Sequence, residues 1–236
     1  MSSNETELYT KFVREKENAC GGGDKLQKLI MKMARNPASG ALVGWAFAHL
    51  HAVLPVRRLV STDRVLAFHH PRPSWETHVL LVPKRRVRSL VGLANPDHVH
   101  LFEEILAAAD LAAEALGLSG AEHVLCANGG PRQEVGQVHF HLFTGERYVS
   151  APAGPPQVII YEDADVVAYH HPSPQWAFHL VIEARDGVAP APLAMAAAHL
   201  VCHLLLEEHG YTLVVADGGR GYGRCAAVHL ISGRKL

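Results

Sequence analysis

The stretch that decides the fold reads Gln133-Glu134-Val135-Gly136-Gln137-Val138-His139-Phe140-His141-Leu142-Phe143. Polar and apolar residues alternate in it with a period of two, which is typical of a half-buried β-strand. Successive side chains on a strand point to opposite faces, so Gln137, His139 and His141 are expected on one face and the apolar residues between them in the core. An amide and two imidazoles on such a strand cost free energy unless they have partners or a ligand. This face is therefore the first candidate site.

Two apolar stretches upstream have the character of β-strands, and histidines lie at the end of the first and at the start of the second. They read Val65-Leu66-Ala67-Phe68-His69-His70-Pro71 and Thr77-His78-Val79-Leu80-Leu81-Val82-Pro83-Lys84. Together with residues 133–143 they resemble the histidine-triad (HIT) family, whose motif alternates three histidines with apolar residues and whose N-terminal hairpin is similar to these two stretches. Gln137 stands where the first histidine of that motif usually lies. The resemblance implies an α+β fold, in which a helix crosses a five-stranded antiparallel sheet and two units usually pair as a dimer.

The sequence also repeats itself. Without gaps, residues 65–78 match residues 166–179, residues 124–130 match residues 213–219, and residues 141–145 match residues 229–233. Three matches in the same order predict two copies of one unit.

These matches, together with the helix-forming stretches among the first 56 residues, predict three parts in the chain. They are an N-terminal helical extension (1–56), a HIT-like unit with the intact motif (57–149) and a degenerate HIT-like unit (157–236), with a Pro-rich linker at 150–156. We expect the two units to join through adjacent strands into one sheet of about ten strands, as a single-chain pseudo-dimer that need not dimerise further.

Hydrophobic periodicity and turn residues predict the elements of each unit. In the first unit, strands are expected at 57–61, 64–69, 77–83, 122–127 and 136–143, with a helix from Asn95 to Gly117. In the second, strands are expected at 157–161, 165–170, 177–183, 211–216 and 225–231, with a helix at about 192–209.

Composition limits the classes of function. Of the 236 residues, 48% are hydrophobic and 19% charged, as in ordinary globular proteins, and the net charge of −1 gives no electrostatic reason to expect nucleic-acid or membrane-surface binding. The four cysteines form no Cys-x-x-Cys pair, which argues against a disulfide framework and a structural zinc site. The longest apolar run, residues 41–54, is shorter than the roughly 20 residues of a membrane helix, and the N-terminus is polar. We expect a soluble, cytoplasmic protein with a small-molecule partner.

The resemblance implies a reaction centred on His139. In the family, the middle histidine attacks a phosphorus atom, and water then cleaves the phosphohistidine. A neutral imidazole is a nucleophile near pH 7, and the hydrogen bond made by one ring nitrogen decides which nitrogen attacks. His141 is implied as a second catalytic residue, which contacts phosphate oxygens and can pass a proton to the leaving group.

The resemblance further implies five substrate-binding residues: Gln137, Gln133, Asn128, His78 and His70. Gln137 can hydrogen-bond but cannot titrate. His70 stands where many nucleotide-binding members have an acidic residue for the ribose hydroxyls, so it departs from the family's pattern. We expect no cofactor and no metal.

In the second copy the motif positions hold Cys225, Ala227 and His229. An alanine cannot attack phosphorus, so the working site is expected in the first copy. The function expected is hydrolysis that releases a nucleoside monophosphate from a small leaving group. Two alternatives stay open, a non-catalytic nucleotide-binding or interaction protein and a nucleotidyltransferase or phosphorylase. The uridylyltransferase branch usually has glutamine at the third motif position, where this chain has His141.

Overall fold

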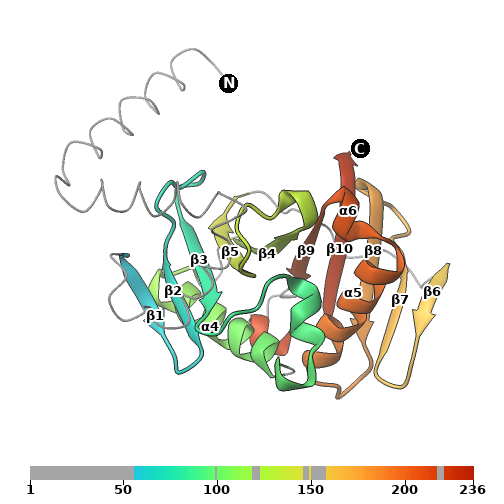
Figure 1. Cartoon of the computed structure of the whole chain (residues 1–236), viewed down its shortest axis with the longest axis horizontal. Coiled ribbons are helices and arrows are strands. Elements are labelled where there is room, and N and C mark those ends of the chain that lie inside the picture. The colour runs from blue at the N-terminus through green and yellow to red at the C-terminus, as the bar shows by residue number, and fades with distance from the viewer. Residues whose placement is uncertain (1–55, 99, 119–122, 146–148, 150–157, 217–220) are drawn as a thin grey trace, which may run out of the picture.

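The computed structural model describes residues 56–98, 100–118, 123–145, 149, 158–216 and 221–236. In this part of the chain, ten antiparallel strands form one sheet in the order β1-β2-β3-β5-β4-β9-β10-β8-β7-β6 (Figure 1). The single sheet of about ten strands expected from the sequence is thereby confirmed. The strands are β1 (Arg58–Ser61), β2 (Val65–His69), β3 (His78–Pro83), β4 (His123–Gly129), β5 (Phe140–Thr144), β6 (Ile159–Glu162), β7 (Val166–His170), β8 (Trp176–Ala184), β9 (Tyr211–Ala216) and β10 (Ala227–Lys235).

One face of the sheet is covered by helices α4 (Leu101–Ala115) and α5 (Ala191–His203), which Figure 1 shows lying across the strands. The apolar residues of α4 recur every three or four positions and so form one stripe that packs on the sheet. The buried members of this stripe include Phe102, Ile105, Leu106, Ala109 and Ala113. They share one apolar core with the inward residues of strands from both halves of the chain and with α5.

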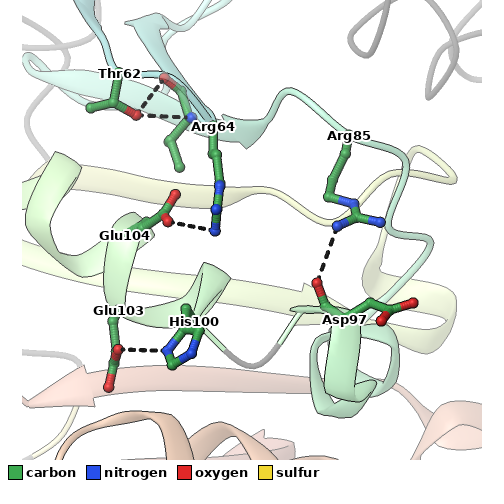
Figure 2. Close-up of polar contacts among 8 residues, drawn as sticks. Thr62, Arg64, Arg85, Asp97, His100, Glu103 and Glu104 are labelled. Atoms are coloured by element: carbon green, nitrogen blue, oxygen red, sulfur yellow. Dashed lines mark hydrogen bonds and ion pairs between the residues drawn. The ribbon is translucent and has the colours of Figure 1, made fainter.

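Polar contacts also link α4 and the segment before it to the strands beside them (Figure 2). The Arg64 guanidinium lies 2.9 Å from the Glu104 carboxylate, and Arg85 donates to the backbone carbonyl of Asp97 at 3.1 Å. Both contacts are exposed, and exposed ion pairs typically contribute less than about 1 kcal/mol. Apolar packing therefore holds α4 on the sheet.

The opposite face of the sheet, which we call the histidine face, carries the candidate site. Residues paired across antiparallel strands share a face. His141 pairs with Cys126 of β4 and Leu80 of β3, so all three side chains lie on this side. At its centre is a small apolar cluster, Val124, Cys126, Phe143, Val214 and Ile231, with histidines on either side of it.

Several predicted boundaries are wrong. The helix expected from Asn95 begins as α4 only at Leu101, and the strand expected at 225–231 is β10, Ala227–Lys235. Two further differences have a local cause. The strand expected from residue 136 begins only at Phe140, because the Gln137 side chain and the Val138 N–H both bond to the segment 83–87 instead of continuing a strand ladder. The helix expected at 192–209 is interrupted. Leu205 adopts φ +54°, outside the right-handed helical region, so α5 is followed by a separate turn, α6 (Leu206–His209).

The two halves of the sheet meet where β4 pairs with β9. Close packing marks the junction: a Cβ on Gly129 would lie only 1.9 Å from the ring of the buried Tyr211. Elsewhere, the Asp110 carboxylate of α4 accepts hydrogen bonds from the backbone N–H groups of Tyr222 and Gly223, at 2.6 and 2.8 Å. The halves thus share their sheet, their core and their polar contacts.

Two further expectations concern parts of the chain that the structure does not describe. Apart from Val56, the helical extension predicted for residues 1–56 lies outside the described residues, and so does the linker at 150–156. Among the described residues, no helix combines the length and the apolar character needed to cross a membrane.

Candidate functional site

His139 lies just before β5, and a hydrogen bond to its ring determines which of the two ring nitrogens is nucleophilic. Its Nδ1 is 2.9 Å from the backbone carbonyl oxygen of Gln137. A carbonyl can only accept, so Nδ1 carries the proton and the lone pair of the neutral ring is on Nε2. Burial lowers the pKa of His139, against the opposing effects of the Gln137 carbonyl and the Glu134 charge. The neutral, nucleophilic form is therefore favoured at neutral pH.

His78 and His141 form a directed pair beside it. The backbone N–H of Ser74 donates to His78 Nδ1 at 3.3 Å, so the proton of the neutral His78 ring is on Nε2. That nitrogen is 2.9 Å from His141 Nδ1 and donates to it, which leaves the His141 proton on Nε2. Burial, together with neighbouring histidines, lowers the pKa of His78 to about 3 and that of His141 to about 2. Both rings are neutral, and His141 presents an N–H donor.

His70 and Trp75 enclose this pair. The His70 ring stacks on His78 with centroids 4.1 Å apart, and its Nδ1 accepts from the backbone N–H of Arg72 at 3.0 Å. Trp75 packs edge-on to His78 and stacks on Phe143. The rings of His139 and His141 are 4.9 Å apart. The structure therefore brings together four predicted site residues: His70, His78, His139 and His141.

Gln137 and Gln133 lie in the loop before β5, and both amides bond to backbone. Gln137 is 0% exposed; its Oε1 accepts from Val87 N, and its Nε2 donates to the carbonyls of Arg85 and Pro83. Gln133 Nε2 donates to the carbonyls of Arg88 and Val135. The expectation that Gln137 shares a strand face with the histidines is wrong, because its amide is turned to hold the segment 83–87.

Asn128 lies on β4, two residues after Cys126. Since Cys126 pairs with His141, Asn128, two residues further along β4, lies on the histidine face, at the end of β4 nearest the start of β5. Asn128 is half-buried, and its Oδ1 accepts a hydrogen bond of 2.8 Å from the hydroxyl of Thr212 on β9. Thr212 was not among the predicted residues. It lies outside the repeated motifs, and only the pairing of β4 with β9 reveals it.

A second cluster, His171, His179 and His229, repeats the geometry of the first in the other half of the sheet. His171 stacks on His179 with centroids 4.3 Å apart, and His179 Nε2 is 2.9 Å from His229 Nδ1. Burial lowers the pKa of His179 to about 4 and that of His229 to about 3. The residue two before His229, where the first cluster has His139, is Ala227.

Each cluster, His70–His78–His141 and His171–His179–His229, brings three imidazole nitrogens within 4.8 Å of one another, a spacing that could hold a metal ion. A metal-bound imidazole offers its lone pair to the metal and donates its other N–H to an acceptor. Here the direction is opposite: backbone N–H groups donate to Nδ1 of His70 and His78, and likewise to Nδ1 of His171 and His179. The hydrogen bonds therefore fit neutral, directed histidine pairs better than a set of metal ligands.

Comparison with known proteins gives three findings. The family model "HIT domain" matches residues 49–148. The chain is 35% identical over 104 residues to an uncharacterised HIT-like protein of Synechocystis, covering 43% of this chain and 88% of that protein, and 33% identical over 105 residues to adenylylsulfatase HINT1 of Arabidopsis thaliana, covering 43% and 69%. A uridylyltransferase structure aligns with a TM-score of 0.51 over 75% of this chain and 78% of its own at 12% identity, a likeness of fold alone.

Proposed function

The chain belongs to the histidine-triad (HIT) family, and on that basis we propose that it is a phosphohydrolase that releases a nucleoside monophosphate through a phosphohistidine intermediate. The observation that carries this proposal is the hydrogen bond from His139 Nδ1 to the Gln137 carbonyl, which leaves Nε2 with a free lone pair. His139 is the proposed nucleophile.

The proposed reaction has two displacements at phosphorus. In the first, the Nε2 lone pair of His139 forms the N–P bond, and the bond to the leaving group breaks with its electron pair going to that group. The ring becomes positive, and its Nδ1–H bond to the Gln137 carbonyl then becomes charge-assisted and stronger. In the second, a water oxygen attacks phosphorus, the N–P electron pair returns to Nε2, and the water proton passes to solvent.

His141 is proposed to stabilise the negative charge that develops on the phosphoryl oxygens. Its pKa of about 2 means that it acts as a neutral N–H donor rather than as a cation. The bond from His78 keeps that proton on Nε2, and the Ser74 N–H does the same for His78. Removing one donor of this kind typically costs about 10²–10³ in rate.

Gln137 and Gln133 are assigned supporting roles in this scheme. Both hold the motif loop against the 83–88 segment through backbone hydrogen bonds. Because Gln137 Oε1 and Nε2 are buried in these bonds, its amide keeps the Gln137 carbonyl in place for His139. A glutamine at the first motif position can hold the loop through these hydrogen bonds, and its protonation does not change with pH.

We further propose that the chain holds two HIT-like units, 57–149 and 157–236, arranged as a single-chain pseudo-dimer. Support comes from the recurrence of the His78–His141 geometry in His179–His229, with equal bond lengths of 2.9 Å. The strand order supports it as well, since β1-β2-β3-β5-β4 is followed by its mirror image, β9-β10-β8-β7-β6. The second unit has Ala227 at the nucleophile position, so the working site is assigned to the first.

The experiment that tests the function is a substrate screen on the purified protein. Nucleoside phosphoramidates and dinucleoside polyphosphates with each base are supplied, and release of the nucleoside monophosphate is followed for the parent and for His139→Ala. We expect turnover by the parent and a loss of at least about a thousandfold in the variant. Nucleotide binding without turnover would favour a binding protein. Product that appears only with an added phosphorylated acceptor would favour a transferase.

A further inference from the structure

We infer that Thr212 and Arg132 are positioning residues for the proposed site, because they orient the Asn128 amide so that its NH₂ group faces the reacting phosphoryl group. This inference rests on the proposed function. It also makes the second unit a contributor to the site of the first, since Thr212 lies on β9.

The three side chains form one hydrogen-bonded chain across the junction of β4 and β9. Asn128 and Thr212 are direct partners in the strand register, and Thr212 Oγ1 donates to Asn128 Oδ1 at 2.8 Å. Arg132 Nη1 donates to Thr212 Oγ1 at 3.3 Å, while its Nη2 donates to the backbone carbonyl of Gly233 at 2.8 Å. Thr212 is only 3% exposed, so water does not compete freely for its hydroxyl.

The direction of the chain follows from its first member. Arginine has donors and no acceptor, so the Thr212 oxygen accepts from Arg132. The Asn128 atom that faces the hydroxyl is Oδ1, which can only accept, so the Thr212 proton is donated to it. An asparagine amide without such a partner can flip. Because Oδ1 is bonded to the Thr212 hydroxyl, Nδ2 with its two protons is turned away from Thr212.

The location of Asn128 gives this orientation a consequence. It lies on the histidine face, at the end of β4 nearest the start of β5, which His139 directly precedes, and it is half-buried rather than enclosed. An N–H donor beside a nucleophile is suited to an anionic phosphoryl oxygen, whereas an amide oxygen there would repel it. The hydrogen bonds from Arg132 through Thr212 to Asn128 therefore direct the Asn128 NH₂ donors, and not its carbonyl oxygen, toward the phosphoryl oxygens on which negative charge develops.

The same geometry explains why a unit without a nucleophile still matters for activity. Thr212 and the Gly233 carbonyl both belong to the second unit, and Arg132 reaches them from the loop after β4. Orienting the Asn128 amide does not require a histidine at the position of Ala227. The second unit contributes the hydroxyl that sets the amide, together with the strand that holds it.

The test compares Thr212→Val, which keeps the shape of the side chain and removes the hydroxyl, with Thr212→Ser, which keeps the hydroxyl. We expect kcat/KM to fall about tenfold in Thr212→Val and to stay within about twofold of the parent in Thr212→Ser, at similar thermal midpoints. Asn128→Ala completes a double-mutant cycle. Thr212→Val should cause no further loss in the Asn128→Ala background, because its effect passes through that amide.

Two results would overturn the inference: parent-like kcat/KM in Thr212→Val, or additive losses in the double variant. If Thr212→Val does not fold, Arg132→Met removes the other end of the chain and should lower kcat/KM in the same direction, again without effect in the Asn128→Ala background. If the parent turns over no substrate, the proposed function fails separately. The inference is then judged on the affinity for adenosine monophosphate and uridine monophosphate by calorimetry, which Thr212→Val should weaken and Thr212→Ser should not.

Discussion

The chemistry proposed at His139 depends on which ring nitrogen carries the proton and on whether the ring is neutral. One backbone carbonyl decides the first point, and burial decides the second. His141 is defined in the same way through His78 and the Ser74 N–H. The tautomer of His139 is thus determined directly by a backbone group, and that of His141 by His78, whose own tautomer is determined by a backbone N–H.

A pH profile follows from the lowered pKa of His139. Protonation of Nε2 removes the nucleophilic lone pair, and burial shifts this protonation below the ordinary histidine value near 6.5. With a substrate that does not titrate between pH 5 and 8, kcat/KM should stay level from pH 8 to below 6.5 and fall only at lower pH. An acid limb centred at or above pH 6.5 would show that the nucleophile is not desolvated in this way.

The sequence identifies the site histidines, but it does not indicate which nitrogen of each ring carries the proton. The alternation around His139 and His141 and the upstream His78 were sufficient to predict a histidine site. The tautomers were not predictable, because they depend on the Gln137 carbonyl and the Ser74 N–H, whose positions no side-chain pattern encodes. Thr212 was missed for a similar reason, since its contact with Asn128 spans 84 residues.

Among the elements, the loop before β5 differs most from its prediction. Strands β2 and β3 and the buried face of α4 follow directly from apolar periodicity. The loop also alternates polar and apolar residues, but its side-chain amide competes with strand pairing by bonding to the backbone of 83–87. The interruption of the helix at Leu205 could not be predicted either, because leucine has no preference for a positive φ.

The buried amide of Gln137 leads to a stability prediction. Gln137→Leu keeps the approximate volume but leaves the Val87 N–H and the Arg85 carbonyl without their partners. We expect the free energy of unfolding to fall by about 1–3 kcal/mol, because the N–H of the buried Val87 loses its hydrogen-bond partner. Denaturant unfolding of this variant beside Gln133→Leu, whose residue is partly exposed, checks it. An unchanged midpoint for Gln137→Leu would mean that the loop does not depend on the amide.

For the molecule as a whole, one ten-stranded sheet carries two histidine clusters on the same face. The duplication in the sequence predicted the continuous sheet, because two copies with edge strands and a short linker are expected to pair. The duplication did not predict the side-chain contacts across the junction of β4 and β9. The packing of Tyr211 against Gly129 and the chain from Arg132 to Asn128 depend on the register of β4 with β9.

The two clusters provide a matched pair of variants. His141→Ala and His229→Ala remove the same motif position from each unit, and each breaks one histidine pair with a bond length of 2.9 Å. Both should lose stability, but only His141→Ala should lower turnover by about a hundredfold or more, since Ala227 leaves the second cluster without a nucleophile. Turnover and thermal midpoints are measured together. A larger loss of turnover in His229→Ala at parent-like stability would place the working site in the second unit.

The most direct test of the account is to trap the covalent intermediate. The parent is mixed with a substrate found by the screen and quenched after milliseconds, and the intact protein and its peptides are weighed by mass spectrometry under conditions that preserve phosphohistidine. The account predicts one added nucleotidyl group on the peptide that contains His139, absent in His139→Ala and present in His229→Ala. Turnover by the parent with no adduct at any quench time, or an adduct on a peptide of the second unit, would contradict it.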